Sequence, residues 1–94
     1  MSTDPRPDTF VGVQTVPIEL YRDPPALDFV KNKIAIEALE AIGEDHHGIT
    51  AIRRPEFSYL FGAIRGPEDE PYEVPTDEEH AEHVHIRCMI RFVQ

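Results

Sequence analysis

The clearest pattern of hydrophobic and polar positions lies between His83 and Val93. Apolar side chains stand there at every second position, with mostly polar or basic side chains between them. A period of two is typical of a strand with one buried face. The predicted inward set is Val84, Ile86, Cys88, Ile90 and Phe92, and the outward set is His83, His85, Arg87, Met89 and Arg91. We therefore predict a half-buried strand with a largely basic outer face.

A second pattern, with helical spacing, runs from Asp23 to Gly43. Asp23 followed by Pro24 and Pro25 is a strong helix start. An aspartate side chain can accept hydrogen bonds from the backbone amides of the first turn, and proline is tolerated in that turn. The apolar stripe is Leu27, Val30, Ile34, Ala38, Ala41 and Ile42. Phe29 and Ile36 fall on the opposite side of this helix. They are either scattered exposed groups or a second contact surface.

Three further segments have the composition of strands. Residues 10–21 contain Pro17, so this strand either lies at a sheet edge or breaks near Val16, and a bulge is the simplest account. Residues 49–54 predict a brief strand, separated by Pro55 from a fuller one over 57–64. The fuller strand carries bulky groups on both faces, so we expect it to be central and covered on both sides.

The predicted element order is β-α-β-β. We expect a single α+β domain over residues 10–94, with one amphipathic helix packed on a small mixed sheet of three to four strands. The first strand should be parallel to one of the later two, which form an antiparallel hairpin around an acidic loop at 66–82. Residues 1–9 are expected to be a flexible arm, and the acidic loop should run over the surface.

Length and charge narrow the functional classes. With 94 residues the chain holds one core, and a net charge of −9 disfavours binding to nucleic acid. No apolar stretch approaches the roughly 20 residues of a membrane span, and residues 1–9 lack the parts of a secretory signal. Cys88 is the only cysteine, which excludes an internal disulfide. We expect a protein of the cytoplasm, or of a larger particle such as a virion.

Three histidines form the best lead toward chemistry. In His80-x-x-His83-x-His85, the last two project from one face of a strand and lie close enough to reach one metal ion, such as zinc. His80 or Glu82 would be the third ligand, and an open position would suit a water molecule. The alternative is a solvated polar face that binds no cofactor. Cys88 is expected to be an inert, inward-facing thiol.

Arg87 and Arg91 form a basic ribbon in an acidic protein. Either the acidic loop folds back to pair with them or they contact another protein. Together with Met89, Phe29 and Ile36, they are the predicted interface residues. These residues favour a non-catalytic protein-protein interaction or assembly subunit that is oligomeric. Examples are a small structural component of a phage-like particle and a regulator of a larger protein. The expected partners are another protein, a further copy of the chain, or both. The alternatives are a metal-binding protein or enzyme that uses the three histidines, and an acidic inhibitor that mimics nucleic acid.

Overall fold

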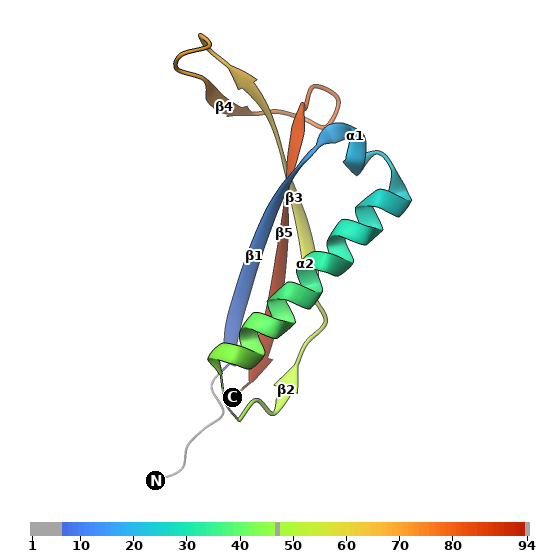
Figure 1. Ribbon diagram of the computed structural model, residues 1–94, viewed down its shortest axis with the longest axis vertical. Coiled ribbons are helices and arrows are strands. Elements are labelled where there is room, and N and C mark those ends of the chain that lie inside the picture. The colour runs from blue at the N-terminus through green and yellow to red at the C-terminus, as the bar shows by residue number, and fades with distance from the viewer. Residues whose placement is uncertain (1–6, 47, 94) are drawn as a thin grey trace.

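The computed structural model describes residues 7–46 and 48–93 and shows an α+β domain with one long helix (Figure 1). Residues 1–6 of the predicted arm lie outside the described residues. The elements are β1 (Pro7–Pro17), α1 (Ile18–Tyr21), α2 (Pro24–Asp45), β2 (Ala51–Ile52), β3 (Glu56–Arg65), β4 (Tyr72–Pro75) and β5 (His83–Val93). Residues 7–9 belong to β1, so the prediction of a flexible arm over 1–9 is wrong for this part.

The five strands form one antiparallel sheet, in which the main path is β1-β5-β3-β4. The expected mixed sheet of three to four strands is therefore wrong. β1 and β3 do run in the same direction, but β5 lies between them and pairs with both, so every hydrogen-bonded pair is antiparallel. The predicted antiparallel pairing of β3 with β5 is confirmed.

The two strands that follow the helix, β2 and β3, lie along the same side of β5. β2 pairs with the last residues of β5, and β3 pairs with its first seven. The register of the two pairings differs by one residue, with Ala51 opposite Val93 and Glu56 opposite Met89. The predicted interruption at Pro55 is confirmed, since proline cannot donate to a ladder.

β1 is an edge strand, as Pro17 indicated, but the expected bulge is wrong. The chain leaves the sheet at Pro17 and enters the single turn α1. The amide of Ile18 then donates to the carbonyl of Glu82 at 3.0 Å. Proline at the cap position loses no bond that a helix needs, so the break takes the form of a helical turn.

α2 begins after Asp23 as predicted and ends at Asp45, two residues beyond Gly43. The Asp23 side chain makes no capping hydrogen bond, so that part of the expectation is wrong. The buried residues of the helix all belong to its predicted stripe. The buried residues of β5 are those that its alternation predicted to face inward. The main core comprises Val30, Ile34, Ala38 and Ile42 of α2, Val84, Ile86, Cys88, Ile90 and Phe92 of β5, and Val16, Ile18 and Ala81.

The acidic segment 66–82 contains an unpredicted strand. β4 pairs with the end of β3, from Gly62 opposite Pro75 to Arg65 opposite Tyr72. The hairpin turns at Gly66, whose φ of 92° is a left-handed conformation that favours glycine. β4 has only four residues, two of them Glu73 and Pro75, so its composition gave no strand signal.

The helices cover one side of the sheet (Figure 1). We call the other side the open face; it carries the β5 side chains from His83 to Arg91 at every second position. Paired residues on neighbouring strands share a face, so the register places β1 and β3 side chains beside them. The open-face set is Thr9, Val11, Val13, Thr15, Glu56, Ser58, Leu60, Gly62, Ile64 and Glu73. The site described below lies on this face.

Candidate functional site

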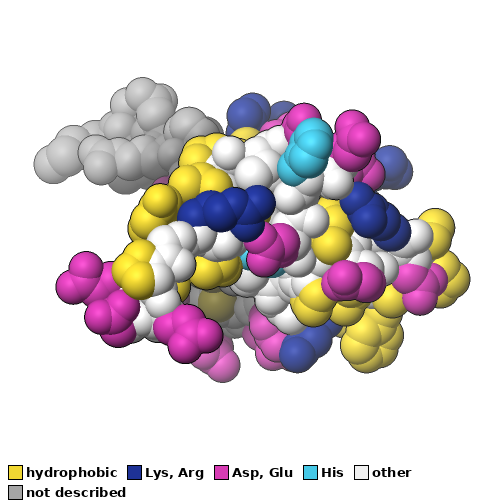
Figure 2. Space-filling model, turned by 90° about the horizontal axis from the view of Figure 1, so that it is seen from above, with side chains coloured by type: hydrophobic (Ala, Val, Ile, Leu, Met, Phe, Trp, Pro, Cys, Tyr) yellow, Lys and Arg dark blue, Asp and Glu magenta, His cyan; other side chains and the backbone are white. Residues whose placement is uncertain are grey.

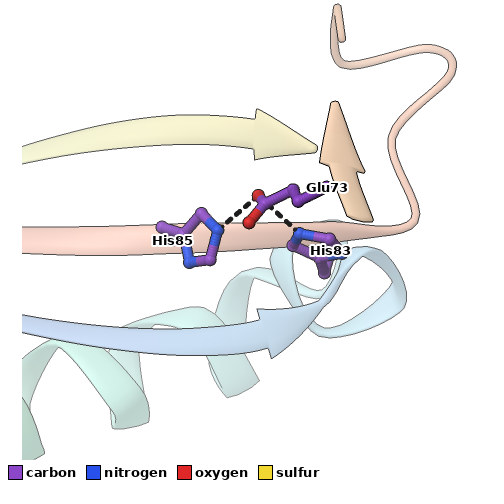
Figure 3. A group of neighbouring side chains, drawn as sticks. All are labelled: Glu73, His83 and His85. Atoms are coloured by element: carbon purple, nitrogen blue, oxygen red, sulfur yellow. Dashed lines mark hydrogen bonds and ion pairs between the residues drawn. The ribbon is translucent and has the colours of Figure 1, made fainter. Parts of the chain in front are cut away.

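Two histidines of β5 and one glutamate of β4 converge on the open face (Figure 3). The Nε2 atoms of His83 and His85 lie 2.8 and 2.5 Å from the same oxygen, Oε1 of Glu73. One potential ligand atom from each residue falls within 4.8 Å of the others. The two imidazole rings stand edge to face with centroids 5.1 Å apart. The side chains of His83, His85 and Glu73 are 15, 27 and 41 % exposed.

Glu73 reaches the histidines by crossing β3 at a glycine. Gly62 pairs with His83 on one side and with Pro75 on the other. A Cβ on Gly62 would overlap with the Glu73 carboxylate and lie 2.9 Å from Nε2 of His83. The φ of Gly62 is not positive, so the backbone does not require glycine there. The missing side chain provides the space that the carboxylate occupies.

Thr15 of β1 contacts the site from the other side. Its Oγ1 lies 2.6 Å from Nδ1 of His85, and the two residues are paired in the β1–β5 register. His85 is therefore held at both ring nitrogens, by a hydroxyl and by a carboxylate. Such a pair of contacts restricts the orientation of the ring.

The two histidines hold the pKa of the Glu73 carboxyl below its usual value, chiefly through the hydrogen bonds from His83 and His85. Glu73 is thus ionised near neutral pH and accepts both hydrogen bonds. Each Nε2 therefore carries the hydrogen that it donates. In chemical terms the cluster is an ionised carboxylate held between two imidazoles.

The structure corrects the predicted third member of this cluster. His80 is not one of the grouped residues; its Nδ1 lies 2.7 Å from Asp77 in the turn before β5. Glu82 pairs with Arg65 instead. Of the predicted metal ligands His80, His83 and His85, the fold brings together the last two, and Glu73 takes the third place.

Sequence reasoning missed Glu73 because it stands ten residues before His83 in a segment interpreted as a loop. The only signal was the short run Tyr72-Glu73-Val74, which alternates around a glutamate. Pairing of that run with β3 brings Glu73 to the edge of the histidine face. Nothing in the local sequence shows that Gly62 is its neighbour.

The predicted basic ribbon is present on the open face. Arg91 lies 3.9 Å from Glu56 of β3, and both side chains are largely exposed. Met89 is half-buried between Val11 and Glu56 in the register, and Arg87 is exposed between Val13 and Ser58. Arg65 lies on the other face. The acidic segment folds back toward β5, as one of the two alternatives predicted. Its Glu73, however, contacts His83 and His85 and not Arg87 or Arg91.

Several large apolar side chains remain exposed. Phe29 and Ile36 on the outer side of α2 are 72 and 56 % exposed, and they border a shallow groove with Asn32, Lys33, Glu37 and Glu40. On the open face Val11, Val13, Leu60 and Ile64 are exposed. The expectation that both sides of β3 are covered is therefore wrong for the single chain.

The acidic side chains of the 66–82 segment do not form one surface. Glu68, Asp69 and Glu70 lie in the β3–β4 turn, and Asp77, Glu78 and Glu79 lie between β4 and β5. At the end of the molecule that carries β4, acidic groups are spread around the rim among basic and apolar ones (Figure 2). This distribution gives little support to a continuous mimic of a phosphate backbone.

Cys88 is fully buried in the core as predicted, and burial raises the pKa of its thiol. None of the described helices is long and apolar enough to span a lipid bilayer. Comparisons of the chain with family models, curated proteins and solved structures found no match.

Proposed function

We propose that this protein is a non-catalytic assembly subunit that pairs with a second copy of itself through the outer edge of β1. The observation that carries the proposal is the contrast between β1 and β4, the strands at the two ends of the main path of the sheet. β4 is a short edge with Glu73 inside it and prolines at 71 and 75. β1 is an 11-residue edge with no charged side chain from Thr9 to Pro17. Natural sheets protect long edges with charges, prolines or bulges, and β1 has none of these in its interior.

The partner at this edge is a second copy because the prolines and valines of β1 are placed symmetrically about Gly12. Pro7 and Pro17 end the strand at five residues on either side of Gly12. An antiparallel pair centred on Gly12 therefore matches the prolines of one copy with those of the other. Val11 of one copy stands opposite Val13 of the other, on the open face. A two-fold pairing of this kind is the commonest form of protein self-association.

The distribution of charge also supports pairing of two copies through β1. The chain has a net charge of −9, so most surfaces of two copies repel each other. β1 is uncharged between Asp8 and Glu19, and pairing there brings no acidic groups face to face. Four valines, two from each copy, then cover one another at the centre of a joined sheet. Val11 and Val13 thereby lose exposed apolar surface, which favours association.

The joined sheet leaves two further surfaces for assembly. Its open faces lie on the same side, because a two-fold axis perpendicular to the sheet keeps both helices on the other side. Arg87, Met89 and Arg91 lie on that open side, while Phe29 and Ile36 lie on the helical side. We assign these residues to contacts with a larger protein or particle, such as a phage-like one.

Light scattering after size exclusion, with sedimentation velocity, tests the proposal on the full chain. We expect the wild type to be a dimer or a larger even-numbered assembly, and Val13→Lys to be monomeric because a lysine at a sheet edge opposes strand pairing. Leu60→Lys is the matched control, since Leu60 is as exposed as Val13, at 62 against 60 %, but lies away from β1. A monomeric wild type, or an equal effect of both substitutions, would overturn the proposal.

Cross-linking tests the register. In the proposed pairing, a Val11→Cys/Val13→Cys double variant places each cysteine opposite one of the partner, within the distance that a disulfide needs. Mild oxidation should give a covalent dimer. Val11→Cys alone should not cross-link, because its counterpart is a diagonal neighbour about 7–8 Å away. Cross-linking of the single variant to the same extent would contradict a pairing centred on Gly12.

A further inference from the structure

We propose that Glu73, His83 and His85 bind one divalent transition-metal ion, of which Zn²⁺ is the representative, and leave at least one coordination position open. The inference is separate from the proposed self-association, because all three ligands come from one chain. It rests on three observations: the convergence of the ligand atoms, the space left by Gly62, and the contact between Thr15 and His85.

The ligand atoms are placed for a small ion. Two imidazole nitrogens from β5 and one carboxylate oxygen from β4 lie together within 4.8 Å of one another, with both nitrogens directed at the oxygen (Figure 3). Tetrahedral zinc with bonds of about 2.0–2.2 Å sets neighbouring ligand atoms roughly 3.3–3.5 Å apart. The present separations from Oε1, 2.8 Å to His83 and 2.5 Å to His85, are those of hydrogen bonds. Each of these two distances needs to lengthen by less than about 1 Å to admit the ion, and rotation of the side chains can supply such a change.

Gly62 is a second, independent observation that supports a metal site. A glycine inside a strand weakens it and often marks a close approach of other groups. Here the approaching groups are the carboxylate of Glu73 and the imidazole of His83, both of which a Cβ would meet. The absence of a side chain at Gly62 of β3 therefore provides the space in which Glu73 approaches His83.

Thr15 supplies the orientation that a metal-bound histidine needs. A ligating Nε2 must present its lone pair to the ion, so the ring hydrogen moves to Nδ1. The Thr15 hydroxyl, 2.6 Å from Nδ1 of His85, then accepts that hydrogen. Partners of this kind fix the tautomer of a ligand histidine and raise its basicity. Metal binding thus replaces the two Nε2–H···Oε1 hydrogen bonds to Glu73 with two bonds from nitrogen to metal, and each ring hydrogen is kept on Nδ1.

The ligand types select the class of metal. Imidazole nitrogens suit zinc, copper, iron and nickel, whereas magnesium and calcium prefer all-oxygen sites. Two histidines and one carboxylate leave a tetrahedral ion with one free position. Depressions lined by Leu60 and Pro75 on one side, and by Pro17 and Ile64 on the other, keep that position accessible from the open face.

Titration of the metal-stripped full chain with Co²⁺ and then Zn²⁺ tests the inference. We expect the visible absorption of protein-bound Co²⁺ to saturate at one ion per chain and to vanish on addition of Zn²⁺. Calorimetry with Zn²⁺ should give the same stoichiometry, while Mg²⁺ should neither bind nor compete. Glu73→Gln and His85→Ala should each weaken Zn²⁺ binding by at least 100-fold.

Two variants separate this site from casual binding by histidine. Thr15→Val keeps the shape of the side chain but removes the acceptor, so we expect Zn²⁺ affinity to fall by about 10- to 100-fold. His80→Ala is the control, because His80 is an exposed histidine that contacts Asp77 and should not affect affinity. Circular dichroism checks that each variant is folded. An affinity unchanged in Glu73→Gln, or lost in His80→Ala, overturns the inference, as does a wild type that binds neither ion.

Discussion

Gly62 and Glu73 face each other so closely that a single methyl group on Gly62 would overlap with the Glu73 carboxylate. We expect Gly62→Ala to change the free energy of unfolding by less than about 1 kcal/mol, because the far end of Glu73 can move aside. Zn²⁺ affinity should fall at least 10-fold in the same variant, since the carboxylate leaves His83 and His85. Gly12→Ala is the control, as its added Cβ meets only ordinary contacts at 3.7 Å. Equal affinity in both variants would show that the gap has no role.

The two sides of α2 should differ sharply in their effect on stability. Ile34 is 5 % exposed and Ile36 is 56 % exposed on the same helix. We expect Ile34→Ala to cost about 2–5 kcal/mol, through lost burial and a cavity, whereas Ile36→Ala should stay within about 0.5 kcal/mol. Urea unfolding of the dilute protein measures both. If Ile36→Ala costs as much as Ile34→Ala, its side chain is covered in solution, which the single chain does not show.

Asp77 is expected to titrate at unusually low pH. Its carboxylate accepts hydrogen bonds from the side chain and the backbone amide of His80, and these hold its pKa below the ordinary value of 3.8. A folded-state pKa below the unfolded value stabilises the fold above that pH range, and the contribution is lost as the pH falls through the folded pKa. NMR titration of the Asp77 carboxyl measures the shift. In His80→Ala the pKa should rise toward 3.8; a value that does not move would contradict this origin.

Cys88 should be inert to thiol reagents in the folded protein. It is fully buried on the central strand, and desolvation raises its pKa. A raised pKa adds stability below the unfolded value, and this is lost as the pH rises through the folded one. We expect a disulfide reagent to react at the rate of unfolding at neutral pH and at once in denaturant. Fast reaction of the native protein would mean that β5 opens far more readily than its burial indicates.

The parts of the fold that sequence reasoning found are those with a long local period. β5 matches residues 83–93, and the stripe of α2 supplies Val30, Ile34, Ala38 and Ile42. The insertion of β5 between β1 and β3 leaves no such trace, because strand order depends on contacts far apart in the chain. β4 is too short, and too rich in proline and acid, to show a period.

The candidate site follows the same division. His83 and His85 were found because alternation places them on one face of a single strand. Glu73 is carried to them by β4, and its path depends on Gly62, so neither could be inferred before the register was known. Thr15 likewise becomes a neighbour of His85 only through the β1–β5 pairing.

The central place of β5 also governs how a nascent chain acquires this sheet. β1, β2 and most of β3 pair with residues 83–93, and Thr15 meets a partner seventy positions later. Among the described strands, only the β3–β4 hairpin has both of its strands before that stretch leaves the ribosome. Such late, distant contacts slow folding, so β1, which is uncharged from Thr9 to Pro17, is made long before the strand with which it pairs.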